Sequence, residues 1–324
     1  MSDEKAIPRL QPPEWLRRNM VTIGPIIAAI VIIAGFQIIN PLFLSYQGII
    51  TLVYAMSYFL IAACGLTFVI MMGSFDFSVV SLLKLAALIC VLYIDKLGLM
   101  VIPLALLVCV SFGLINGLLV TKFNVPSFMA TLGISIVVEG IALYLSKGFL
   151  HIMYDDTFRA LAITFIWGLP SIFYWAIGIW IISTFIALYM PFGRRTYAVG
   201  GNLLGAGLSG INVERHRIFV FMLSGFFAGL AGVLYMAQMG GGSMEIGADM
   251  SIPLFASVVA GGTALTGGVG GPQKTLFGVI IITWIRAGML MLAMGRDIQM
   301  IVFGLIAIIM GIATIDRKRI KVIK

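Results

Sequence analysis

The chain has 324 residues, of which 61% are hydrophobic and only 10% are charged, and its formal net charge is +8. Soluble proteins are usually about 25% charged, so this composition excludes an ordinary water-soluble domain. The Lys and Arg residues are dispersed at the ends of apolar segments rather than along one polar face, which argues against a nucleic-acid partner. The lipid bilayer is therefore the expected surrounding.

Apolar segments of membrane-spanning length follow one another along the chain. Because a helix needs about 20 apolar residues to cross the bilayer, we predict an all-α, polytopic membrane helix bundle of about ten transmembrane helices. The segments are continuously apolar and do not alternate in polarity, which argues against the strands of a barrel. The expected spans are residues 20–39, 48–72, 78–94, 99–120, 127–146, 172–190, 217–239, 252–265, 275–293 and 298–315. The eighth is short and broken, because Pro253 lies near its start and glycines follow it.

The expected domain organisation is simple. Residues 1–19 form a cytoplasmic N-terminal segment, residues 20–315 the transmembrane domain, and residues 316–324 a basic cytoplasmic tail. The first apolar segment is too long for a signal peptide and has no small-residue cleavage site, so we expect it to be retained. With both termini in the cytoplasm, the inside segments hold 15 Lys and Arg residues and the outside segments only 4. This bias predicts a multi-pass protein of the cytoplasmic membrane with both ends inside.

The order of crossings predicts an internal symmetry. The second to fifth spans begin outside, whereas the seventh to tenth begin inside, so the chain would contain two inverted four-helix halves. Inverted repeats are a common plan among transporters. The prediction depends on the short eighth span being a true crossing.

Two connections between spans are long. The outer one, residues 147–171, carries His151, Asp155 and Trp167 and is expected to lie at the membrane surface, where it could meet an external partner. The inner one, residues 191–216, is rich in glycine, which suits close packing, and its arginines could contact lipid headgroups or a cytoplasmic protein.

The most distinctive local motif is GGTALTGGVGG at residues 261–271. Its six glycines, with Thr263 and Thr266, can bring backbone amides and hydroxyls close to another helix or to a solute. A tight helix turn with close packing is the competing interpretation. The overlapping GVGGPQKT resembles a phosphate-binding loop, but Gln273 replaces a required glycine and Pro272 removes a backbone donor, so we expect no nucleotide site here.

Charged residues within the apolar spans are costly and therefore informative, at roughly 2.5–3.5 kcal/mol each on insertion scales. Lys84, Glu139 and Arg286 lie well inside predicted spans. Glu139 is expected to pair with Lys84 or Arg286, either as a structural lock or beside a polar pathway. Asp76, between the second and third spans, is expected to cap the following helix by accepting backbone amide bonds. Polar and aromatic side chains in other spans, which would suit a sugar-like solute, complete the candidate pathway: Asn116, Phe128 and Trp284.

Nothing in the chain indicates an enzyme. The two histidines, His151 and His216, fall on opposite predicted sides of the membrane, so they cannot form one metal cluster or nucleophile–base pair. Cys64, Cys90 and Cys109 lie in apolar runs and are expected to be buried packing residues, and the 19 methionines are interpreted in the same way. We expect no cofactor and no metal bound by this chain.

The motifs resemble those of the membrane permeases of ribose-type ABC sugar importers, a family that includes autoinducer-2 and other monosaccharide systems. The most specific matches are GGTALTGGVGG at residues 261–271, FGRRTYAVGGN at residues 192–202 and SGINV at residues 209–213. Weaker matches are FDFSVVS at residues 75–81 and VPSFMATLG at residues 125–133. The resemblance covers most of the chain.

The resemblance implies three protein partners: a cytoplasmic ATPase subunit that binds the ATP, an extracytoplasmic solute-binding protein, and a second permease copy, identical or closely related. The solute would pass between the two permease copies. It also implies that a coupling helix within residues 197–213 docks into the ATPase. The residues assigned to this coupling by resemblance are Arg194, Arg195, Tyr197, Gly200, Gly201, Asn202, Ser209, Gly210, Ile211, Asn212 and Val213.

The chain departs from the family pattern at several positions inside the membrane. The family usually has a glycine at Val80, a small residue at Lys84, an arginine at Glu139 and an asparagine at Arg286. It also commonly has an acidic stretch where residues 251–253 are uncharged. Either the pathway is adapted to a different solute, or compensating ion pairs have moved.

The expected function is that of a permease subunit that translocates a small polar solute, such as a monosaccharide, with energy from a separate ATPase. An ion-gradient-driven secondary transporter, in which Asp76 and Glu139 would bind or titrate the ion, is the alternative. A membrane scaffold or receptor without transport is a third.

Overall fold

The computed structural model describes residues 30–31, 33–242 and 250–314, and these residues are almost entirely helical. Residues 33–39 are helical and end the expected first span, the rest of which lies largely outside the described residues, as do the expected terminal segments 1–19 and 316–324. The helices that follow are α2 Tyr46–Met71, α3 Val79–Leu97, the 3-10 turn Gly98–Met100, α4 Val101–Thr121, α5 Ser127–Ser146, α6 Asp156–Ile163, α7 Ser171–Tyr189, α8 Pro191–Gly201, α9 Leu203–Leu208, α10 Val213–Met239, α11 Ser251–Ala260, α12 Pro272–Met291 and α13 Arg296–Thr314.

Six segments of the described chain are long and apolar enough to cross a membrane, with the hairpin of α3 and α4 counted as one 43-residue segment. They contain α2, α3 with α4, α5, α7, α10 and α12. The prediction of an α-helical polytopic membrane protein is confirmed, whereas the count of ten crossings is not. The helix α11 is only 10 residues long, as the proline and glycines of this region led us to expect.

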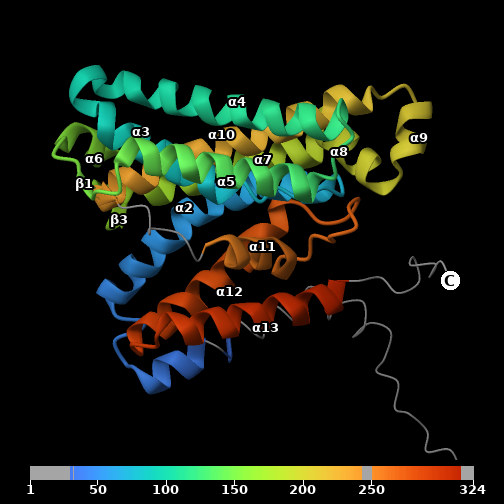
Figure 1. Cartoon of the computed structure of the whole chain (residues 1–324). Helices are drawn as coiled ribbons and strands as arrows, with labels where there is room; N and C mark the ends of the chain where they lie inside the picture. The colour runs from blue at the N-terminus through green and yellow to red at the C-terminus, as the bar shows by residue number, and fades with distance from the viewer. Residues whose placement is uncertain (1–29, 32, 243–249, 315–324) are drawn as a thin grey trace, which may run out of the picture.

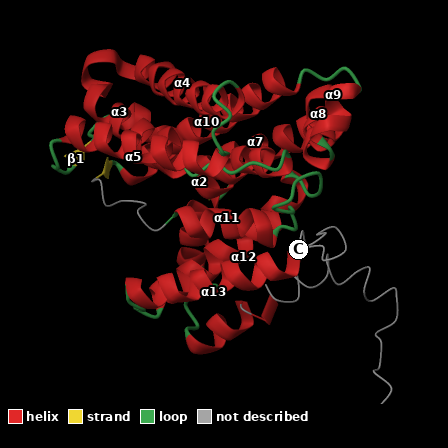
Figure 2. Ribbon diagram, turned by 45° about the vertical axis from the view of Figure 1, so that its right-hand side comes forward, coloured by secondary structure: helices red, strands yellow, loops and turns green. Residues whose placement is uncertain are grey.

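Two layers of helices are visible (Figures 1 and 2). One contains α3, α4, α5, α7 and α10, the other contains α11, α12 and α13, and α2 contacts members of both. The short helices α8 and α9 lie at one end of the bundle, and α6 lies at the opposite end (Figure 1). The long inner and outer connections of the sequence are thus at opposite ends.

The packing of the two expected halves is reciprocal. The first helix of one half, α2, packs against α11 and α12 of the other, and the first helix of the second half, α10, packs against α3 and α4. Within the halves, α3 contacts α4 and α5, and correspondingly α11 contacts α12 and α13. The helices α2 and α10, each the first of its half, also contact one another. An exchange of the two halves would convert each of these contacts into another of them, and the contact of α2 with α10 into itself.

Small residues allow the central helices to approach closely. A Cβ added to Gly225 of α10 would strike the carbonyl oxygen of Cys109 in α4, and one added to Gly117 of α4 would lie 2.8 Å from the Cα of Ile218 in α10. The three cysteines are free and buried. Van der Waals contact between helix backbones therefore stabilises the centre of the bundle, where lipid supplies little hydrophobic drive between helices.

The connection of residues 147–171, which the sequence predicts to lie outside, is an ordered structure. Asp155 caps α6, since its Oδ1 accepts a hydrogen bond of 2.7 Å from the amide of Phe158. A two-residue strand pair, β2 Phe165–Ile166 with β3 Leu169–Pro170, turns through Trp167 and Gly168, both at positive φ. A second pair joins β1 His151–Ile152 to β4 Gly241–Gly242. Trp167 stands at the tip with 93% of its surface exposed.

Candidate functional site

The glycine-rich connection between α11 and α12 forms a compact junction with two other elements. The amide of Gly268 donates a 2.8 Å hydrogen bond to the carbonyl of Met71, at the end of α2. The hydroxyl of Tyr197, on α8, donates a 2.7 Å bond to the carbonyl of Gly270. Five glycines of the connection have φ between +75° and +135°, which other residues rarely adopt. The connection therefore ties α8 to both layers of the bundle.

Gly200 is the closest contact of α8 in this junction. A Cβ at this position would overlap the carbonyl oxygen of Met71 and lie 2.6 Å from the amide nitrogen of Gly268. In contrast, a Cβ on Gly201 would meet no atom within 4 Å. Gly210 also has open space around it, but its φ of +82° favours glycine. Of the three glycines assigned to coupling, only Gly200 is required by packing.

The other residues that the resemblance assigns to coupling have capping, surface or partly buried positions. Asn202 and Asn212 cap α9 and α10, accepting bonds from the amides of Gly205 at 2.9 Å and Arg215 at 3.0 Å. Ser209 donates to the carbonyl of Gly205. The other members are two exposed arginines and two partly buried apolar residues: Arg194, Arg195, Ile211 and Val213.

A feature that sequence reasoning missed is the apolar tip of this segment. Leu204 is 77% exposed and Leu208 is 92% exposed, both on α9. The motif LLGAGL contains the signal, because a six-residue helix between spans is too short to bury all of its leucines. Exposed leucines on α9, together with exposed arginines on the neighbouring helix α8, provide side chains suited to contact with a protein partner.

The resemblance of residues 268–275 to a phosphate loop has no structural counterpart. The amide of Gly268 is bonded to Met71, and the amide of Gly271 donates to Thr263 Oγ1 at 3.1 Å. Thr275 shares a 2.8 Å hydroxyl contact with Thr67 inside the bundle. The donors that would bind phosphate are thus engaged within the protein, and Thr263 has a packing role. Thr266 is exposed on the same connection.

Asp76 lies at the centre of a buried polar network. Its Oδ1 accepts from the amide and hydroxyl of Ser78 at 3.0 and 2.6 Å, and its Oδ2 accepts from Ser224 of α10 at 2.7 Å. Asn116 of α4 extends the network by donating to Ser78 Oγ at 2.8 Å. Burial raises the pKa of the Asp76 carboxyl, and the bonds from Ser78 and Ser224 oppose that shift. Asp76 was expected to cap α3 by accepting backbone amide bonds, and one such bond, from the amide of Ser78, is present. The network also joins the start of α3 to α4 and α10.

The charged residues of the spans separate into a pair and a single cation. Lys84 Nζ lies 3.5 Å from Glu139 Oε1, so Lys84 and not Arg286 is the partner of Glu139. The lysine side chain is only 10% exposed and the glutamate is 48% exposed. The pair joins α3 to α5, and its half-exposed carboxylate lies at the surface of the helix bundle.

Arg286 lies on the wall of a cavity of about 690 Å³ between α2, α10 and α12. Its polar lining also includes three tyrosines, a glutamine and two threonines, none of which the sequence singled out: Tyr54, Tyr58, Tyr235, Gln238, Thr51 and Thr283. No local motif links these residues, because they come from three helices.

The two aromatic candidates do not line this cavity. Trp284 packs edge-on against Phe43, with ring centroids 6.3 Å apart. Phe128 is in edge contact with Phe77 at 5.3 Å, and Phe77 stacks on Phe255 at 4.4 Å. The nine predicted pathway residues therefore fall into several separate groups and do not form one site.

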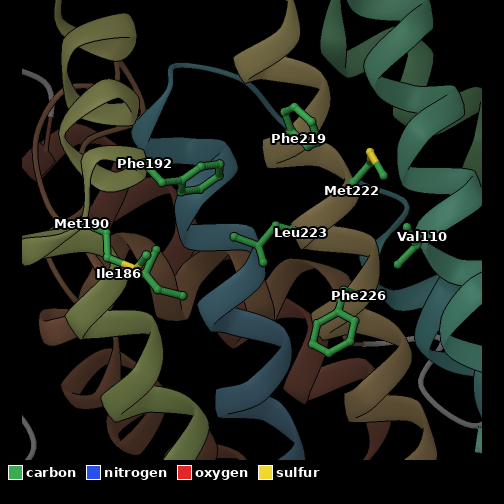
Figure 3. A pocket seen from close by; sticks show the side chains of 8 residues that line it. All are labelled: Val110, Ile186, Met190, Phe192, Phe219, Met222, Leu223 and Phe226. Atoms are coloured by element: carbon green, nitrogen blue, oxygen red, sulfur yellow. The ribbon is translucent and has the colours of Figure 1, made fainter. Parts of the chain in front are cut away.

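A second hollow, of about 460 Å³, is lined only by apolar side chains and lies between α4, α7, α8 and α10 (Figure 3). Leu223 occupies its centre, with Phe192 and Phe226 on either side (Figure 3). It offers no group that could bind a polar solute, and its chemistry suits a hydrocarbon chain.

The fold and these features define a polytopic α-helical membrane protein with an internal polar cavity and an ordered helical segment at one end, a design typical of transport proteins. Residues 48–311 match the family described as the branched-chain amino acid transport system / permease component. The chain belongs to this family of ABC transporter permease subunits, which are not enzymes.

Curated relatives cover nearly the whole chain. The ribose import permease of Haemophilus influenzae is 34% identical over 89% of this chain and 91% of its own length. The ribose import permease of Bacillus subtilis is 31% identical over 93% of this chain and 94% of its own. The L-arabinose transport system permease of Escherichia coli is 29% identical over 87% of each. No solved structure matches the chain.

Proposed function

We propose that this chain is the permease subunit of an ABC importer that carries a monosaccharide or a related small polar solute. The relatives named above are ribose and arabinose permeases, and they match over most of their length. In this proposal the chain binds no ATP, since a separate cytoplasmic subunit hydrolyses it. A solute-binding protein delivers the solute outside, and a second permease copy completes the pathway.

The observation that carries the proposal is the junction of α8 with the connection between α11 and α12. It links an exposed segment at one end of the bundle to the backbone of both layers through the bonds at Gly268 and Gly270. A force on α8 and α9 would thus reach α2 and α12 directly. That is what a permease driven by an external ATPase requires.

The same proposal places α8 and α9 in the cytoplasm and the tip of the outer connection outside. The positive-inside bias supports this orientation. Ten crossings, in two inverted halves, complete it. The reciprocal packing of α2 with α11 and α12, and of α10 with α3 and α4, supports the inverted relation.

The docking experiment compares two equally exposed side chains at opposite ends. Leu208→Glu should abolish co-purification of the permease with its ATPase, because it places a charge on the apolar tip of α9. The control Trp167→Glu alters a side chain with 93% exposure on the outer hairpin and should leave ATPase association unchanged. Equal ATPase recovery with both variants would contradict the assignment of the docking surface.

The energy source separates this proposal from a secondary transporter. Uptake should stop when ATP is depleted and should persist when a protonophore dissipates the proton gradient. Loss of uptake with the protonophore at an unchanged ATP concentration would support the ion-gradient alternative instead.

A further inference from the structure

We propose that the cavity around Arg286 binds an anionic group of the solute, so that the transported compound is a polyhydroxylated molecule with a carboxylate or phosphate. This inference rests on the proposed transport function and narrows the substrate class. It arises from the composition of the cavity, in which Arg286 is the only charged group among the described lining residues.

Arg286 stands at the junction of two cavities. It lines the 690 Å³ cavity between α2, α10 and α12, and also a smaller one of about 220 Å³ beside α11 and α13. No carboxylate of the described residues lines either cavity. Within the described part of the chain, the ion pairs join Lys84 to Glu139 and Lys122 to Glu214, and neither includes Arg286. A cation inside a bundle is costly unless an anion or water compensates it.

Three tyrosines line the cavity with Arg286, and each of their hydroxyls can donate a hydrogen bond. The positive charge of Arg286 acts on Tyr58 and Tyr235, whose rings are in edge contact at 4.8 Å. Gln238 Oε1 is a buried acceptor without a partner in the described structure. A guanidinium with phenol hydroxyls matches the oxygens of a carboxylate or phosphate, and the unpaired acceptor matches a solute hydroxyl. The tyrosine rings supply faces for the C–H groups of a sugar.

The size and position of the cavity fit this occupant. Its volume is within the range of about 300–1000 Å³ that is usual for small-molecule sites. It is formed by the first part of α2 and the last parts of α10 and α12, which the proposed orientation places in the outer half of the membrane. A solute released from an external binding protein would reach this region early in its path.

The test uses three probes that share a carbon skeleton: D-ribose, D-ribonate and D-ribose 5-phosphate. Binding is measured by calorimetric titration of the purified permease in lipid nanodiscs. At least one of the anions should bind about tenfold or more tightly than D-ribose, because a charge-assisted bond contributes more than a neutral one. The stronger of the two identifies carboxylate or phosphate as the recognised group.

Variants then assign the preference to one residue. Arg286→Gln should remove the preference for the anion, whereas Arg286→Lys should retain part of it. Lys96→Gln removes another outer cation, exposed at the end of α3, and should keep the full preference. Tyr58→Phe should weaken binding of all three probes without changing their order. Retained D-ribose binding shows that a variant is folded.

Three results would overturn the inference. They are equal binding of D-ribose and both anions, absence of anion binding to the unaltered chain, and an anion preference that persists in Arg286→Gln. Equal binding of the three probes would show that the charge of Arg286 recognises no group of the solute. Because these measurements use the permease alone, they do not depend on ATPase association, which tests the proposed function separately.

Discussion

Replacing Gly200 by alanine should separate ATP hydrolysis from solute uptake. The added Cβ would overlap the carbonyl oxygen of Met71 and approach the amide of Gly268 to 2.6 Å, so it enters the site of the hydrogen bond that joins these two groups. Overpacking of this kind costs about 1–3 kcal/mol, and loss of the bond leaves two buried groups that add about 1–3 kcal/mol. The backbone groups involved cannot move as a flexible side chain would. We therefore expect the junction to open while the membrane-spanning helices remain packed.

The assay is performed with the permease, its ATPase and its binding protein in proteoliposomes. Gly200→Ala should keep a substantial rate of ATP hydrolysis but lose at least about tenfold in uptake per ATP hydrolysed, as loss of roughly 1.4 kcal/mol of coupling energy implies. Gly201→Ala is the matched control, because a Cβ there meets no atom within 4 Å, and it should transport like the unaltered chain. Normal uptake by Gly200→Ala, or an equal defect in Gly201→Ala, would refute the reasoning.

Three other substitutions test the buried polar contacts through thermal unfolding of the purified permease. Asp76→Ala should destabilise the fold by about 1–3 kcal/mol, because Ser224 and the start of α3 lose their common acceptor; an unchanged midpoint would show that the network contributes nothing. Glu139→Gln should destabilise by about 1–2 kcal/mol by leaving the mostly buried Lys84 unpaired, and adding Lys84→Met should recover most of the loss. If the double variant is no more stable than Glu139→Gln, the ion pair has no such role. Tyr197→Phe removes one hydrogen bond to the glycine-rich connection and should cost about 1 kcal/mol, and a loss of less than a few tenths would indicate that the bond is not formed in the membrane.

Hydropathy was sufficient to predict most of the helices. The expected segment 127–146 coincides with α5, and the expected breaks near Pro253 and after it coincide with the short α11 and its glycine-rich connection. Such predictions succeed because a backbone in lipid must satisfy its own hydrogen bonds, which leaves the helix as the only choice for a long apolar segment.

The candidate sites were harder to predict, because they depend on which helices meet. Charge alone narrowed the partner of Glu139 to Lys84 or Arg286. Choosing Lys84 requires the knowledge that α3 lies beside α5. The tyrosines around Arg286 are ordinary apolar-span residues in the sequence and become a set only when α2, α10 and α12 pack together. The role of Gly200 likewise depends on a carbonyl far away in the chain.

The central claim is that the segment formed by α8 and α9 faces the cytoplasm, where an ATPase reaches it. Single cysteines test this directly, since Cys64, Cys90 and Cys109 are buried and give little background. A membrane-impermeant maleimide should label Trp167→Cys in intact spheroplasts and Leu208→Cys only in inside-out vesicles. Labelling of Leu208→Cys from outside intact spheroplasts would contradict the orientation and the docking surface together.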